Sequence, residues 1–224
     1  MMLSRSQLQP LIQRHAPLLR QLEALYAEMD GHYAAVADAH AFVCHGCEDN
    51  CCLTRFHHHT LVEVAGLYKG FLTLDKDQRR GVVQRARLYC QALQTDAPHG
   101  SPFRHLCPLN QNSRCLLYPQ RPMICRLHGI PHVLRHPRKG VIEGTGCHIF
   151  ETSCPRGGGP RLDRTPLYAA MAGLEQALRQ AAGWEPPLRL TVAEMIAGFA
   201  APDPPIGPAA GHGPGSDGDG REDR

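Results

Sequence analysis

The stretch Cys44-His45-Gly46-Cys47-Glu48-Asp49-Asn50-Cys51-Cys52 carries four of the ten cysteines of this 224-residue chain. A two-residue gap lets a turn aim the thiols of Cys44 and Cys47 at one metal, and Gly46 allows the tight backbone. A thioredoxin-like redox pair follows a strand, whereas a helix is predicted to precede this pair. We therefore expect metal chelation here.

Cys51 and Cys52 are neighbours in the sequence, so their side chains tend to diverge. Both thiols would need a strained backbone to reach a single ion. We expect them to serve different metal atoms. This favours a cluster with several irons, or two separate sites, over one tetrahedral zinc ion.

Five further cysteines follow in two groups, and the first group lies in a stretch from 97 to 130 that is rich in proline. A loop this long inside a compact domain needs something to hold it, and metal ligation is the natural candidate. Cys90 is set apart because it falls on the apolar face of a predicted helix. The candidate metal ligands are Cys44, Cys47, Cys51, Cys52, Cys107, Cys115, Cys125, Cys147 and Cys154.

Two arginines stand next to predicted ligands. Arg121 and Arg126 flank Cys125 and would offset thiolate charge and donate hydrogen bonds to sulfur, which tunes a metal centre. We assign both as candidate cofactor-binding residues. The alternative is that they form surface salt bridges.

Several histidines lie close to the cysteines in the sequence. His57, His58 and His59 precede a predicted helix, but three consecutive imidazoles cannot share one face, so at most two reach a common site. His128 and His148 follow Cys125 and Cys147 closely and are candidates to replace a thiolate or to hydrogen-bond to one. The alternative for all five is an ordinary polar turn.

The rest of the chain predicts helices. Apolar residues from Leu18 to Val36 recur at three-four spacing, and Pro17 suits the first turn. We expect this long helix to pack on its own domain, with a homodimer seam as the alternative. Further helices are predicted from their start signals: a capping box of Thr60 with Glu63 begins one that runs to about Phe71, and Asp75 caps the next. Thr165-Pro166 begins a helix to about Ala182, and Thr191 with Glu194 begins the last.

A small β-hairpin is predicted from His132 to Glu143, around His136-Pro137-Arg138-Lys139-Gly140. From Ala201 onward the sequence is Pro, Gly and charge, which predicts a disordered tail. The expected fold class is mainly α, with an irregular cysteine-rich metal-binding core and this hairpin. The expected organisation is N-terminal helices over 1–43, a metal-binding domain over 44–200 and the tail over 201–224.

Composition and hydropathy indicate which compartment and which partners to expect. The first 20 residues contain no apolar stretch of signal-peptide length, and no run of 18 apolar residues occurs. We therefore expect a cytoplasmic protein with reduced thiols and no membrane contact. The formal charge is +3 without a dense Lys/Arg run, so nucleic acid is not an expected partner.

The order of the cysteine motifs resembles a known family. The pair Cys44 and Cys47 is followed by Cys-Cys, Cys-Pro, Cys-x-x-Tyr, Arg-Pro-x-x-Cys-Arg and a late Cys, up to Cys154. This series is similar to the CxxCxxCC, or YkgJ-like, family of zinc- or iron-chelating proteins, although the gap before Cys51 is three residues where the family has two. The resemblance implies metal binding through these cysteines, commonly as an iron-sulfur cluster. Flagellin lysine methylases share the cysteine pattern, but this chain has no methyltransferase-like strand and glycine-rich loop.

The sequence therefore predicts an iron-sulfur protein, with one 4Fe-4S cluster favoured and a role in redox chemistry or electron transfer. Its partner would be a protein or small redox molecule that the sequence does not identify. One alternative is a zinc-binding structural module without catalysis. Another is a metal-dependent modifying enzyme, for which no catalytic residue can be assigned.

Overall fold

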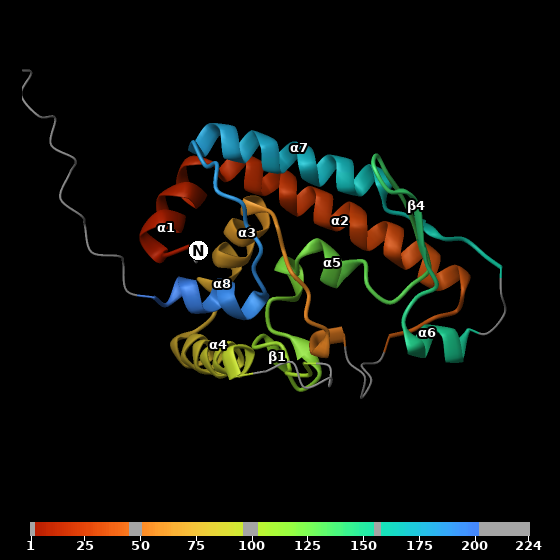
Figure 1. Ribbon diagram of the computed structural model, residues 1–224, viewed down its shortest axis with the longest axis horizontal. Coiled ribbons are helices and arrows are strands. Elements are labelled where there is room, and N and C mark those ends of the chain that lie inside the picture. Colours follow the sequence, from red (N-terminus) through yellow and green to blue (C-terminus); the bar gives the residue numbers. More distant parts are fainter. Residues whose placement is uncertain (1–2, 45–50, 96–102, 155–157, 202–224) are drawn as a thin grey trace, which may run out of the picture.

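The computed structural model of the chain describes residues 3–44, 51–95, 103–154 and 158–201. Most of the predicted tail lies outside the described residues. The described chain is mainly helical, as predicted (Figure 1). Its α-helices are α1 (Arg5–Arg14), α2 (Ala16–Ala39), α3 (Leu61–Phe71), α4 (Lys76–Thr95), α5 (Met123–Arg126), α6 (His148–Ser153), α7 (Thr165–Ala182) and α8 (Val192–Phe199).

Helix α2 has the amphipathic stripe that the sequence predicts. Leu22, Leu25 and Met29 are buried on one face, and Pro17 lies in its first turn. That face packs against α3 and α7 of the same chain, and α7 runs alongside α2 in Figure 1. The apolar stripe is thus covered within the chain, as expected for packing on its own domain.

On the other side of α3, helix α4 packs against α8 (Figure 1). The buried side chains of these helices and of α1 and α2 join one hydrophobic core. The N-terminal helices of residues 1–43 therefore share their core with the segment that follows them. The described residues contain no helix that is long and apolar enough to cross a membrane.

All four helices predicted from start signals are present, as α3, α4, α7 and α8, and two of the predicted side-chain caps are confirmed. The Asp75 carboxylate accepts hydrogen bonds from the N–H groups of Asp77 and Gln78, at 2.9 and 2.8 Å, at the start of α4. Thr191 and Glu194 form a reciprocal capping box at the start of α8.

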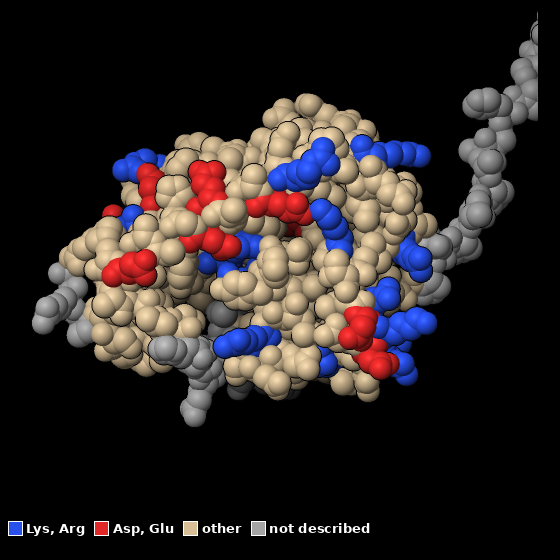
Figure 2. Space-filling model, turned by 180° about the vertical axis from the view of Figure 1, so that it is seen from behind, with Lys and Arg blue, Asp and Glu red and all other residues tan. Residues whose placement is uncertain are grey.

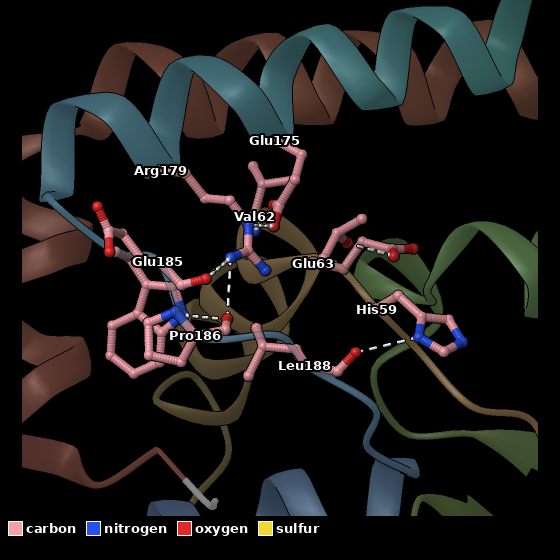
Figure 3. A network of polar contacts seen from close by, with 10 residues as sticks. His59, Val62, Glu63, Glu175, Arg179, Glu185, Pro186 and Leu188 are labelled. Carbon is pink, nitrogen blue, oxygen red and sulfur yellow. Dashed lines mark hydrogen bonds and ion pairs between the residues drawn. The ribbon is translucent and has the colours of Figure 1, made fainter.

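The capping box predicted at Thr60 is wrong. The Thr60 hydroxyl donates to the Glu63 carboxylate at 2.5 Å and caps no backbone amide. Glu175 of α7 accepts from the Val62 N–H at 2.9 Å instead, as Figure 3 shows. The Glu175 carboxylate, distant in the sequence, thus satisfies one of the first amides of α3, the task that the local pattern assigned to Thr60. The Glu63 carboxylate, which a capping box would direct to the Thr60 N–H, bonds to other groups.

The predicted hairpin is confirmed: β3 (His132–His136) pairs antiparallel with β4 (Gly140–Gly144). A short strand that the sequence did not signal, β5 (Leu162–Asp163), adds parallel to β3. Three short elements, all in or near the cysteine-rich segments, complete the described chain. They are the 3-10 turns η1 (Cys51–Leu53) and η2 (Tyr118–Gln120), and the two-residue hairpin β1 (Asn110–Gln111) and β2 (Arg114–Cys115).

Candidate metal centre

A cavity of about 860 Å³ lies among η1, the loop that carries β1 and β2, α5, and the start of α8. Most of the predicted ligands that the structure describes come together on its walls, although they are spread over more than 100 residues of sequence. The cysteines that line it are Cys44, Cys52, Cys107, Cys115, Cys125 and Cys147.

Four of these thiols form one group, which we call the thiol quartet: Cys52, Cys107, Cys115 and Cys125. Ionisation of any one of them affects the others, since Cys52, Cys107 and Cys115 all raise the pKa of Cys125. Cys52 and Cys115 in turn raise the pKa of Cys107, and Cys52 raises that of Cys115. Every pair in the quartet is therefore within electrostatic reach.

Burial is the main cause of these shifts. It raises the pKa of Cys107 to about 12, the pKa of Cys115 to about 11, and that of Cys125 well above its ordinary range. At neutral pH the free thiols of Cys107, Cys115 and Cys125 are therefore protonated. A bound metal would reverse this, because a coordinating thiol is deprotonated outright.

A tight hairpin places Cys107 and Cys115 together. Asn112 and Ser113 both have positive φ, 52° and 62°, which is the type I′ turn that fits a two-residue hairpin loop. Asn110 is thereby paired with Cys115, and the Leu116 N–H donates to the carbonyl of Leu109 at 2.9 Å. This hairpin was not among the elements predicted from the sequence, although Asn112 is a residue type that favours such a turn.

Backbone amides lie near two of the quartet thiols. The N–H groups of Leu109 and Asn110 lower the pKa of Cys107, and that of Leu117 lowers the pKa of Cys115, although burial outweighs them. The Asn110 N–H itself donates to the Cys107 carbonyl at 2.9 Å. Such N–H donors stabilise thiolates and tune the potential of thiolate-bound metals. The loop therefore supplies the partners that an ionised sulfur needs.

The other two members of the quartet are held by long-range contacts. The Cys107 N–H donates to the Cys52 carbonyl at 2.9 Å, which joins the first cysteine segment to the second. Cys125 lies on α5, whose first amide, of Met123, donates to the Glu63 carboxylate at 2.7 Å. Glu63, which the sequence pattern assigns to a capping box, thus fixes the position of Cys125 relative to α3.

Both predicted arginines line the cavity. Their positive charges lower the pKa of Cys115. Both also pair with the Asp30 carboxylate, as in the salt-bridge alternative, so their role at a cofactor stays a prediction. Arg126 is buried and bonds to the Asp30 carboxylate at 2.5 Å and to the carbonyl oxygens of Arg121 and Pro119. These three hydrogen bonds of Arg126 all go to oxygen.

The guanidinium of Arg121 has fewer polar partners than that of Arg126. Its guanidinium stacks over the Tyr118 ring at 3.5 Å from the centroid and lies 3.8 Å from Asp30. Its Nε is buried and has no hydrogen-bond partner among the described residues. A donor left over beside a group of thiols fits the predicted role of Arg121 in contacting a cluster.

Cys44 and Cys147 belong to a different part of the cavity. Both raise the pKa of Tyr33, and the Cys147 N–H donates to the Gly129 carbonyl at 3.1 Å. Cys154 is not among the cavity residues, and its thiol donates to the His40 carbonyl at 3.4 Å. Cys47 and the side chain of Cys51 fall outside the described part of the chain, so the pairing of Cys44 with Cys47 stays a prediction.

The predicted histidines separate in space. His58 and His128 line the cavity, and the His128 ring packs edge-on against Phe56. His59 bonds through Nδ1 to the Leu188 carbonyl at 3.0 Å, and His148 is exposed at the start of α6. Cys90, predicted as an apolar residue, packs half-buried against the core.

Among the residues that the structure describes, no three or more Cys, His, Asp and Glu side chains are spaced to hold a metal ion. The chemistry of the quartet, the amides near its thiols and the unpartnered Arg121 Nε nevertheless fit a thiolate-bound group.

The charged surface is mixed: on the face in Figure 2, Lys and Arg are interspersed with Asp and Glu. Comparison with family models, with curated proteins and with solved structures gives no match for this chain.

Proposed function

We propose that this protein binds an iron-sulfur cluster, of the 4Fe-4S type, through the thiol quartet and acts in electron transfer. The observation that carries the proposal is the gathering of Cys52, Cys107, Cys115 and Cys125 from three separate segments onto one cavity, with every pair in electrostatic reach. Four thiolates are the usual ligand set of such clusters. When bound, the cluster would supply one-electron redox chemistry.

The cysteine series supports a cluster over a single zinc ion. A simple tetrahedral zinc site takes four ligands, whereas the sequence offers nine candidate thiols. Two of these, Cys51 and Cys52, are neighbours whose side chains tend to diverge, so they suit a group with several metal atoms better than one ion.

The chain's own residues have defined tasks in this proposal. The N–H groups of Leu109, Asn110 and Leu117 lie near Cys107 and Cys115, lower the pKa of these thiols and so favour the thiolate. Arg121 and Arg126 offset negative charge at Cys115. The four cysteines are partly buried, and the resemblance of the cysteine series to the CxxCxxCC family agrees with metal chelation.

Metal and sulfide analysis tests the proposal. Protein purified without oxygen should be brown, absorb broadly near roughly 400 nm, and contain iron and acid-labile sulfide in equal amounts. Colourless protein with stoichiometric zinc and no sulfide would establish the zinc-module alternative instead.

A matched pair of variants tests the ligand assignment. Cys125→Ser should lose iron, sulfide and colour, because it removes one quartet ligand at a buried position. Cys90→Ser should keep all three, since Cys90 lies on α4 outside the cavity lining. Equal metal content in the two variants would remove the quartet as the site.

A further inference from the structure

The cavity also has a wall without cysteine. It consists of His58 and the residues Thr191, Val192 and Ala193 at the start of α8, and we call it the α8 wall. None of these residues is needed to hold the proposed cluster. Phe56 lines the same cavity and adds apolar surface.

The backbone on both sides of His58 is fixed. The His58 N–H donates to the Leu190 carbonyl at 2.8 Å, and the Leu190 N–H donates back to the His58 carbonyl at 3.0 Å. The next residue, His59, bonds to Leu188, and Arg179 of α7 holds the carbonyl of Pro186 at 2.9 Å (Figure 3). His58 is therefore set beside the start of α8 by several independent bonds.

The imidazole of His58 lacks a partner. The residue is only 3% exposed, and its Nε2 is buried without a hydrogen bond to any described residue. Burial lowers its pKa to about 4, so the ring is neutral at physiological pH. A buried polar nitrogen left unpaired is destabilising, so a native site of this kind calls for a partner.

The start of α8 offers further donors. The Thr191 hydroxyl accepts from the Glu194 N–H at 3.2 Å, which leaves the amides of the first two helical residues, Val192 and Ala193. The first turn of a helix favours negative charge and oxygen acceptors. The acidic residue of this turn, Glu194, has its Oε2 bound by the Thr191 N–H and hydroxyl at 2.7 and 2.8 Å.

We propose that the α8 wall binds a small carboxylate that carries an apolar body, with His58 Nε2 and the first amides of α8 donating to its oxygens. Phe56 and Tyr89, which line the cavity, supply surface for the apolar part. A volume of about 860 Å³ is in the range of small-molecule sites. The site does not rest on the proposed cluster, although a molecule bound there would share the cavity with the thiol quartet.

Calorimetric titration of the purified chain with benzoate and with benzamide tests this proposal. Benzoate should bind, and benzamide, which has the same ring without the charge, should bind at least about tenfold more weakly. Equal affinities would overturn the carboxylate assignment, and no binding of either would overturn the site. Iron and sulfide are measured on the same sample. A preparation that binds benzoate but contains no cluster would contradict the proposed iron-sulfur function and leave the carboxylate site standing.

Variants locate the binding to the α8 wall. His58→Leu should weaken benzoate binding about tenfold or more, while His58→Gln, which keeps an N–H donor, should recover part of that loss. His57→Leu is the control and should leave affinity unchanged, because His57 does not line the cavity. Unchanged affinity in His58→Leu contradicts the proposal.

Val192→Pro tests the helix amides without touching His58. Proline suits the first helical position and removes its N–H, and Thr191 already has the extended backbone that precedes proline. Benzoate affinity should fall several-fold with the circular dichroism spectrum unchanged. Wild-type affinity in this variant would overturn the role of the amides, so the test stands even if His58→Leu fails to fold.

Discussion

The helices α2, α3 and α7 and the loop from Phe103 to Leu127 are held together by different forces. The helices bury leucines and other apolar side chains against one another. The regular elements of the loop are only two to four residues long, and it buries thiols whose pKa values are raised. The loop also places Leu109, Leu117 and Leu127 in the hydrophobic core. We therefore expect the helices to fold without a ligand, whereas the proposed cluster would hold the loop in addition to these buried leucines.

Removal of the metal should produce the largest difference between the two regions. Treatment with a chelator and oxidant, or Cys107→Ser, should collapse amide protection over residues 103–127 while α2, α3 and α7 keep theirs. Hydrogen exchange followed by mass spectrometry measures both regions at once. Equal loss of protection in both would show that they form one cooperative unit.

Loss of core packing should affect the helices whether or not metal is bound. Leu22 is 1% exposed, so Leu22→Ala should lower the free energy of unfolding by about 2–5 kcal/mol. Urea denaturation of loaded and stripped protein should give the same decrease. A decrease seen only in the loaded form would couple this core to the metal centre.

Helices α2 and α3 approach closely at Gly66. A Cβ added there would lie 2.7 Å from Leu22 Cδ2, so Gly66→Ala should cost about 1–3 kcal/mol of stability. The double variant with Leu22→Ala should be more stable than the sum of the two changes predicts, since the shortened side chain makes room for the new methyl group. Strict additivity in urea denaturation would contradict this contact.

Glu63 connects the two regions and should give a smaller, pH-dependent effect. Burial raises its pKa above the ordinary value of 4.5, so the folded state prefers the protonated form. Stability contributed by this group is complete below pH 4.5 and is lost as the pH rises through the folded pKa, by at most about 1.4 kcal/mol per pH unit. Glu63→Gln, which keeps an acceptor for Met123, should remove that slope from denaturation curves measured across this range.

The smallest effect is expected at the surface. Lys69 of α3 bonds to Glu23 of α2 at 2.5 Å, but both side chains are 46% exposed. Lys69→Ala should therefore change stability by about 0–1 kcal/mol, and less in high salt. A loss well above this in thermal denaturation would mean that the pair fixes the packing of α2 on α3.

Local patterns in the sequence predicted the helices well. The stripe on α2, the Asp75 cap and the Thr191 box depend on residues three or four apart, so periodicity and capping rules suffice for them. The Thr60 box failed because Glu175, more than 100 residues away, supplies the bond that the local pattern offered. Partners this far apart in the sequence cannot be recognised from the spacing of residues within a motif.

The candidate site could be predicted only in part. The sequence identified the thiols and the two arginines, but not which cysteines meet, because that depends on the turn at Asn112 and Ser113 and on the Glu63 bond to Met123. The burial of His58 depends equally on its pairing with Leu190, a residue from the far end of the chain. Each of these contacts joins segments that are separate in the sequence, and no motif encodes them.

X-ray absorption at the iron edge of the anaerobically purified chain tests the central claim most directly. A cluster on the thiol quartet predicts sulfur neighbours at about 2.3 Å together with a clear iron-iron distance, and both should vanish in Cys125→Ser. Absence of iron, with a zinc edge that shows sulfur neighbours and no metal-metal distance, would contradict the account.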